Sequence, residues 1–178
     1  MRRTRFDEWQ CSVARTADLL GDWWTPLVLR EAFFGSRRFD DFVEILGISR
    51  NTLTERLARL VEEGILAKQA YQESPTRYEY TLTEKGRALF GVLASMIRWG
   101  DDWLASEDGP PVELVDLSTG EVVHPMVVDE RTGKPLDHRS LRARPGPGMN
   151  EVERARFEER RALRRHGPSA PAPHTSDA

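Results

Sequence analysis

The sequence predicts a mainly α-helical protein with one small β-hairpin, an α+β class, and two patterns carry this prediction. Residues 39–63 show the spacing of two short amphipathic helices with a glycine, Gly47, between them. Two β-prone segments follow, residues 65–71 and 77–82, on either side of a Ser-Pro turn. Two helices joined by a short turn containing Gly are typical of a helix-turn-helix, and a following hairpin is typical of its wing. We therefore expect a winged helix-turn-helix, followed by a β-hairpin appendage and a charged helix.

The composition is that of a folded, charge-rich chain. Of the 178 residues, 39% are hydrophobic and 31% are charged, which disfavours a fully disordered protein. No apolar run could cross a bilayer, and residues 1–6 lack the apolar stretch of a leader peptide, so we expect a cytoplasmic protein with no membrane partner. The net charge of −3 argues mildly against a nucleic-acid ligand, although residues 37–77 hold seven basic and seven acidic side chains and are balanced.

Two helices are predicted ahead of the central region. The first ends before Gly21 and is indicated by apolar residues at helical spacing, namely Val13, Ala14, Ala17 and Leu20. Thr25 and Pro26 are the expected N-cap and first-turn residue of a second, largely buried helix, which ends before Gly35.

Local signals place the ends of the two central helices. Gly47 suits the left-handed conformation that ends the first of them, predicted from Phe39 to Leu46. Ser49 can cap the second, which Gly64 closes. The buried face of this second helix is predicted to consist of Leu53, Leu57, Leu60 and Val61.

A long amphipathic helix is predicted after the hairpin. Thr83 would cap it, and Gly100 would break or end it. Its apolar side carries Leu89, Val92, Leu93, Met96, Ile97, Trp99, Trp103 and Leu104. Because this is more apolar surface than a small winged domain needs, we expect a second copy of the chain to cover it in a homodimer.

Segments rich in Pro and Gly divide the rest of the chain. Two Asp-x-x-Thr-Gly sequences, at 116–120 and 129–133, lie among β-forming valines and predict two hairpins. A helix capped by Asn150 and Glu153 follows, with Glu–Arg pairs at i,i+3 spacing to support it. We therefore divide the chain into a winged domain at 1–108, an appendage at 109–148, a charged helix at 149–166 and a disordered tail at 167–178.

Many short matches in order make roughly the first hundred residues resemble the HxlR family of MarR-related winged-helix regulators. The matching segments are Cys11-Ser-Val-Ala, Trp24 to Glu31, Gly35 to Phe39, Gly47-Ile-Ser, Leu53 to Leu57, Glu63-Gly-Ile65, Pro75 to Thr83 and Gly86. The resemblance implies a DNA-binding homodimer whose first and last helices form the interface, with its recognition helices in successive major grooves.

The appendage resembles an extension that carries cysteines in some members. Here that neighbourhood holds Ser118, Thr119, Glu130 and Thr132, so we expect no metal.

The predicted recognition helix carries polar residues that suit DNA bases. A helical wheel places Asn51, Thr52, Glu55 and Arg59 away from the leucine face, with Ser49 at the helix start and Arg50 and Arg56 on the flanks. Asn and Arg can pair bidentately with adenine and guanine, and a carboxylate can accept from cytosine. A solvated helix face would show the same pattern and is the alternative interpretation.

Three further arginines are expected to contact DNA phosphates or the minor groove. Arg37 and Arg38 precede the first motif helix, and Arg77 lies at the tip of the wing. Surface ion pairs are the alternative for these side chains, with Asp40, Asp41 or Glu73 as the partners.

Other side chains suggest an effector, either an oxidant or a small molecule. Cys11, the single cysteine, agrees with a reducing compartment, and the adjacent helix N-terminus and Arg15 favour a reactive thiolate. A buried apolar role at an interface is the alternative for Cys11.

Four tryptophans are candidates for an effector pocket or for ordinary packing, namely Trp23, Trp24, Trp99 and Trp103. The histidines lack the spacing of a zinc site, so we expect no cofactor.

No sequence motif indicates an enzyme, because phosphate-binding glycine loops, nucleophile elbows and His-Glu-x-x-His helices are all absent. We predict a sequence-specific transcription regulator, nucleoid-associated when bound to DNA and a repressor rather than an activator. The homodimer would bind a palindromic operator in double-stranded DNA through helix 49–63 and wing 65–82. The alternative is a protein-interaction module that uses the winged domain and the charged C-terminal helix without binding DNA.

Overall fold

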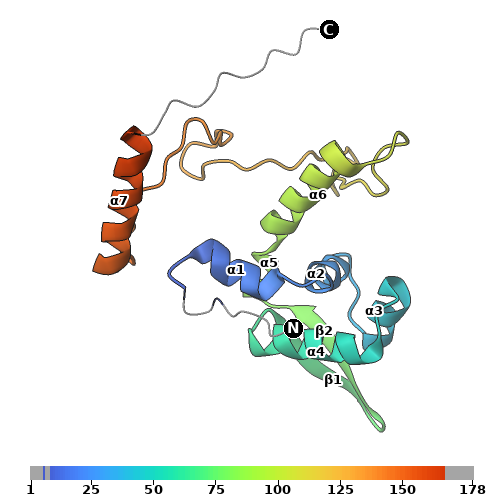
Figure 1. Cartoon of the computed structure of the whole chain (residues 1–178). Coiled ribbons are helices and arrows are strands. Elements are labelled where there is room, and N and C mark those ends of the chain that lie inside the picture. Colours follow the sequence, from blue (N-terminus) through green and yellow to red (C-terminus); the bar gives the residue numbers. More distant parts are fainter. Residues whose placement is uncertain (1–5, 7–8, 167–178) are drawn as a thin grey trace. The chain divides into compact units, whose positions relative to one another are not determined.

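A computed structural model of the chain describes residue 6 and residues 9–166, with side chains through residue 163 (Figure 1). The chain divides into two compact units, residues 1–136 and 137–178, and each is described by itself. The tail predicted to be disordered, 167–178, lies outside the described residues. No helix in the described part has both the length and the apolar character needed to span a membrane.

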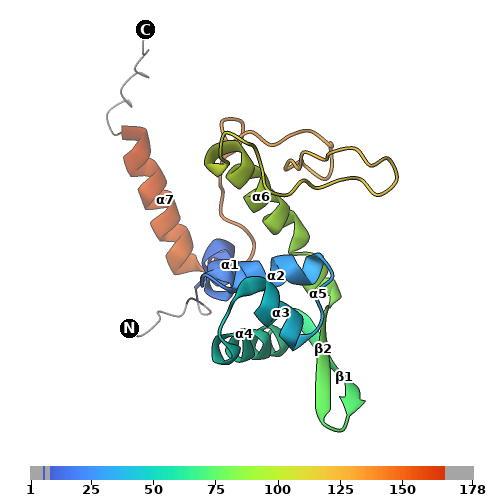
Figure 2. The same cartoon turned by 90° about the vertical axis from the view of Figure 1, so that its right-hand side faces the viewer.

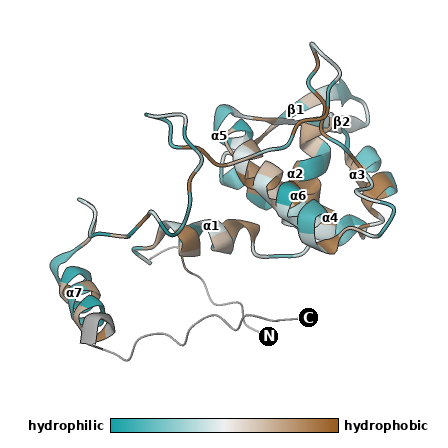
Figure 3. Ribbon diagram, turned by 90° about the horizontal axis from the view of Figure 1, so that it is seen from above, coloured by the Kyte–Doolittle hydropathy of each residue, from teal (hydrophilic) through white to brown (hydrophobic). Residues whose placement is uncertain are grey.

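The first unit is mainly helical with one antiparallel hairpin (Figure 2). Its elements are α1 (Ser12–Leu20), α2 (Thr25–Phe33), α3 (Phe39–Leu46), α4 (Arg50–Glu62), β1 (Leu66–Glu73), β2 (Thr76–Leu82), α5 (Glu84–Arg87) and α6 (Phe90–Leu104). The helices have distinct polar and apolar faces (Figure 3). Their apolar faces and the start of β1 meet in a core that includes Val28, Leu29, Phe42, Leu53, Leu57, Leu60, Ile65 and Leu66. The predicted winged helix-turn-helix is confirmed.

The turn between α3 and α4 has the predicted geometry. Gly47 lies in the left-handed region at φ 62°, and its N–H donates to the Val43 carbonyl at 3.0 Å. Ser49 caps α4, because its hydroxyl accepts from the Thr52 N–H at 3.2 Å. These two residues end one helix and begin the next within three positions, which sets α4 at an angle to α3.

The wing is a two-stranded hairpin extended by a short third segment. β1 pairs with β2 from Leu66 opposite Leu82 out to Glu73 opposite Thr76, with an irregularity between Ala70 and Gln72. The segment before α3 joins this sheet through a bridge between Arg38 and Glu79, and the Tyr80 N–H donates to the Arg37 carbonyl at 2.8 Å. The base of the wing is therefore fixed to the start of the helix-turn-helix.

Two local predictions for the helices are wrong. Thr25 is the first residue of α2 rather than its cap; the Asp22 carboxylate accepts from the N–H groups of Trp24 and Thr25, each at 2.9 Å. The long helix after the wing is broken into α5 and α6 at residues 88–89, while Gly100 lies inside α6. The break at residues 88–89 leaves α5 as a single turn. The Thr83 hydroxyl caps this turn by accepting from the Gly86 N–H at 3.0 Å.

The hairpins predicted in the appendage are present as two tight turns, each organised by an aspartate. Asp116 accepts from the N–H of Ser118, and Asp129 accepts from the N–H of Thr132, both at 2.8 Å. Gly120 and Gly133 end the turns with φ of 72° and 66°. Single bridges close the turns, Val115 with Val122 and Val128 with Pro135.

The second unit contains one helix, α7 (Glu151–His166). Asn150 caps it as predicted, because its side-chain oxygen accepts from the Glu153 N–H at 2.9 Å. Of the expected i,i+3 pairs, Glu153 and Arg156 form an ion pair at 2.9 Å.

Candidate nucleic-acid interface

The N-terminal half of α4 presents a polar face to solvent. Leu53 and Leu57 are fully buried on the opposite face, so the side chains between them point outward. The exposed set is Ser49, Arg50, Asn51, Thr54 and Glu55, while Thr52 is half-buried beside the Ser49 hydroxyl. Thr54 was missed by the sequence prediction, although a helical wheel places it on the edge of the same face.

Arg56 and Arg59 point inward rather than toward solvent. Arg59 donates to the carboxylate and the carbonyl of Asp18 at 2.8 and 3.0 Å. Arg56 forms an ion pair with Asp22 at 3.4 Å, and both side chains are largely buried. The two arginines therefore join the recognition helix to α1 and to the start of α2, and the structure does not place them with the outward residues.

Asp22 is the central group of this joint. Burial raises its pKa, but hydrogen bonds from the Thr25 hydroxyl and from two backbone N–H groups, with the charge of Arg56, more than offset that effect. The pKa of Asp22 accordingly lies below its ordinary value, so the carboxylate is charged at neutral pH. One side chain thus caps α2 and holds the inner face of α4.

Arg38 is held at the base of the wing. Its guanidinium donates to the Glu79 carboxylate at 3.2 Å and lies 4.7 Å from the centre of the Tyr71 ring. The hydrogen bond to Glu79 is the main reason that the pKa of Arg38 is raised. Its neighbour Arg37 is exposed.

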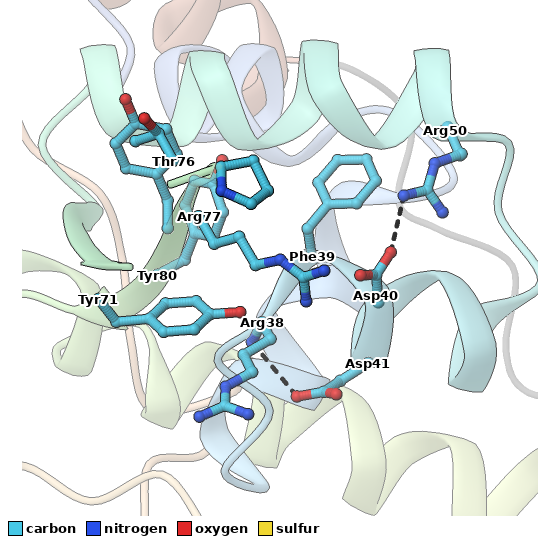
Figure 4. Close-up of a pocket in the computed structure, with 11 residues that line it drawn as sticks. Arg38, Phe39, Asp40, Asp41, Arg50, Tyr71, Thr76, Arg77 and Tyr80 are labelled. Carbon is cyan, nitrogen blue, oxygen red and sulfur yellow. Dashed lines mark hydrogen bonds and ion pairs between the residues drawn. The ribbon is translucent and has the colours of Figure 1, made fainter. Parts of the chain in front are cut away.

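A groove of about 510 Å³ separates the wing from the starts of α3 and α4 (Figure 4). On the helical side of the groove, Arg50 of α4 pairs with Asp40 of α3 at 2.7 Å and lies 5.1 Å from the centre of the Phe39 ring. Arg77 extends from the wing into the same groove and has no ion-pair partner among the residues that the structure describes. The groove thus brings together Arg38, Arg50 and Arg77. All three are among the DNA-contacting residues predicted from the sequence.

The wing itself adds residues that the sequence prediction missed. Tyr71 and Tyr78 are exposed, and the Lys68 ammonium lies 3.9 Å from the centre of the Tyr78 ring. Strand alternation alone could have placed these residues outside, but it does not show which of them border a groove.

A separate apolar hollow of about 1050 Å³ lies along α6 and the segment 125–128. Its lining includes Phe90, Met96, Trp99 and Leu104, all of which are at least 45% exposed. The ring of Phe90 also contacts Phe33 of α2 at a centroid distance of 5.3 Å, which ties α6 to the winged domain.

Residues 19–108 match the family model described as HxlR-like helix-turn-helix. The match spans half of the chain and includes the α4 face, the wing and the joint at Asp22. The chain belongs to the HxlR family. It is therefore a helix-turn-helix transcriptional regulator, as the sequence resemblance implied.

Related proteins and structures agree with membership of the HxlR family. An uncharacterized HTH-type transcriptional regulator of Mycobacterium tuberculosis is 43% identical over 138 residues, which are 78% of this chain and 87% of the relative. The crystal structure of PA1607, described as a candidate transcription factor, matches with a TM-score of 0.73 and 38% identity, over 80% of this chain and all of that one. The oxidized form of the redox regulator HypR matches with a TM-score of 0.50 and 32% identity, over 54% of this chain and all of that one.

The predicted sensing residues of this HxlR-family chain lie apart. Cys11 is exposed at the N-cap position of α1. Trp24 packs against the core, Trp23 and Trp103 are 92% and 74% exposed, and Trp99 alone of the four lines the hollow along α6. Within the described residues, no group of three or more His, Cys, Asp or Glu side chains is arranged to hold a metal ion.

Proposed function

We propose that this chain binds double-stranded DNA as a homodimer and represses transcription at a palindromic operator. The observation that carries the proposal is the capped start of α4, where Arg50 shares the groove with the wing arginine Arg77 and the following residue, Asn51, is exposed. An α-helix fits the major groove of DNA, and a hairpin with a basic tip at its side fits the flanking backbone.

Base contacts are assigned to the outward face of α4. Asn51 and Arg50 can each form bidentate hydrogen bonds, to adenine and to guanine respectively. Thr54 and Glu55 extend the same exposed face by one turn. Arg56 and Arg59 take a different role in this proposal, because their ion pairs with Asp22 and Asp18 orient the helix rather than contact bases.

Phosphate contacts are assigned to the groove and its edges. The ion pair of Arg50 with Asp40 is about two-thirds exposed at both ends, so it is weak and can be exchanged for a phosphate contact at low energetic cost. Arg77, which has no acidic partner among the described residues, and the exposed Arg37 can contact the backbone directly. Arg38 would stay on Glu79 and keep the wing in place.

The dimer interface is assigned to α6. Its exposed apolar side chains, with Met126, Val127 and Val128 beside them, line a broad apolar hollow that a second copy of the chain could cover. A two-fold axis at α6 would repeat α4 in a second half-site, about 10 base pairs away when the two helices enter successive major grooves. A repressor then acts by covering the promoter.

Selection of bound sequences from a random duplex library tests the proposal. The full chain should enrich an inverted repeat, and the operator should silence a reporter promoter in cells that express the protein. Failure to enrich any motif, or binding that does not weaken as salt increases, would reject sequence-specific DNA binding and favour a protein-docking role for the wing.

Oxidant sensing is assigned to the exposed thiol of Cys11. The likeness to a redox regulator supports this assignment. Oxidant treatment should change the affinity of the wild-type protein for the selected DNA and leave Cys11→Ser unaffected. Equal responses of the two proteins would remove Cys11 as the sensor.

A further inference from the structure

The two compact units of the chain carry opposite charge. Residues 1–136 hold 17 basic and 23 acidic side chains, a net charge of −6, whereas residues 137–178 hold nine basic and six acidic ones, a net charge of +3. All nine basic residues of the second unit are arginines. This unit lies outside residues 19–108, which the family model matches, so its charge has no part in the winged domain.

Three of these arginines gather around one hollow. Arg142, from the segment before α7, faces Arg160 and Arg161 of the helix, and together with Ala143 and Phe157 they line a space of about 440 Å³. Phe157, Arg160 and Arg161 have i, i+3 and i+4 spacing, which places them on one side of α7. We refer to Arg142, Arg160 and Arg161 as the C-terminal arginine cluster.

The C-terminal arginine cluster has no acidic partner among the residues whose side chains are described. Arg156, by contrast, is paired with Glu153 at 2.9 Å. Glu158 has i,i+3 spacing to Arg161, but these two side chains form no ion pair among the described residues, and Glu159 lies about 200° around the helix from Phe157. Three guanidinium groups therefore line one hollow and form no ion pair among the described side chains, which makes this surface favourable for an anion.

We propose that the C-terminal arginine cluster is a second DNA-binding site, which binds backbone phosphates without reading bases. Arginine matches phosphate through two parallel hydrogen bonds and stays charged at any physiological pH. A basic unit would also offset the repulsion between DNA and the acidic first unit. The proposal rests on the proposed function for the identity of the polyanion, but it needs neither the α4 face nor an operator.

The test uses the full chain and a labelled 40-base-pair duplex of random sequence. Binding is measured from low to moderate salt for the wild type, for Arg160→Gln/Arg161→Gln, and for Arg131→Gln/Lys134→Gln. The last variant removes the same charge from an exposed appendage turn and is the matched control. Arg160→Lys/Arg161→Lys keeps the charge and shows whether any loss comes from an altered helix, which circular dichroism also checks.

Loss of two phosphate contacts should lower the slope of log affinity against log salt by about 1.8 and weaken binding roughly tenfold at low salt, relative to the control. The lysine variant should retain most of the slope. Equal slopes for the glutamine variant and its control would overturn the proposal and leave an acidic protein as the partner of this surface. If no sequence motif is selected but the random duplex still shows this loss, the operator proposal fails and the arginine cluster stands; the reverse outcome rejects only the cluster.

Discussion

Arg59 of the recognition helix holds Asp18 of α1 by two hydrogen bonds, to the carboxylate at 2.8 Å and to the backbone carbonyl at 3.0 Å. The Asp18 side chain is only 8% exposed, so this contact lies within the folded domain rather than on its surface. Arg59 and Asp18 are 41 positions apart in the sequence. This contact makes the orientation of α4 a property of the N-terminal helix as well as of the helix-turn-helix.

Arg59→Ala should lower the free energy of unfolding by about 2–3 kcal/mol, because it leaves a buried carboxylate without its cation. Urea unfolding at neutral pH measures this loss. Arg50→Ala is the matched control, since its ion pair with Asp40 is exposed and should contribute less than about 1 kcal/mol. Equal stability of the two variants would contradict the structural role given to Arg59.

The Asp22 carboxylate should make stability fall in acid. Its pKa in the folded protein is below the ordinary value of 3.8, so its contribution is complete above about pH 4 and is lost as the pH falls through the lower, folded-state pKa. Asp22→Asn keeps a capping oxygen but no charge. The variant should be less stable than the wild type at pH 6, and the difference should shrink toward pH 2–3 in urea unfolding; a difference independent of pH would exclude the charge as its cause.

The sequence predicted the backbone of the winged domain better than it predicted the partners of its arginines. Gly47 and Ser49 act through neighbours within a few positions, so local rules find them. Arg56 and Arg59 occupy positions on the helical wheel that could face either DNA or α1. Their acidic partners are more than 30 positions away, and only the tertiary fold decides between the two.

The break between α5 and α6 has the same kind of origin. The Thr83 cap and the apolar spacing from Leu89 to Leu104 predict one helix, but a Cβ at Gly86 would lie 2.3 Å from the Ile65 carbonyl oxygen. The single turn of α5 therefore packs closely against the start of the wing, and α6 begins only after it, at Phe90. Helical periodicity carries no information about such a contact.

Gly86→Ala should lower the free energy of unfolding by about 2–3 kcal/mol, because the added methyl group meets backbone that cannot move aside easily. Gly91→Ala is the control: a Cβ there meets nothing within 4 Å, and alanine favours a helix by about 0.5–1 kcal/mol. Thermal unfolding compares the two variants. A neutral Gly86→Ala would show that α5 can shift away from Ile65.

Asn51 and Arg77 should affect DNA binding in different ways. Asn51→Ala should cost about 1–3 kcal/mol on the selected operator and relax the preference at one base position, with little change on random DNA. Arg77→Ala should weaken binding to both DNAs and lower the salt slope by about 0.9. Fluorescence anisotropy on both duplexes measures these effects, and a uniform loss for Asn51→Ala would assign it to the backbone rather than to a base.

The apolar side of α6 should decide the oligomeric state. Met96 is half exposed and lines the hollow beside Trp99, so a charge at this position would be buried without a partner in the proposed dimer. Met96→Glu should therefore shift the protein from dimer to monomer in light scattering, and should weaken binding to the full inverted repeat more than to a single half-site. Leu117→Glu is the matched control, because Leu117 is fully exposed on an appendage turn and its replacement should leave the dimer intact. A Met96→Glu dimer as stable as the wild type would move the interface away from α6, and the half-site spacing inferred from it would no longer follow.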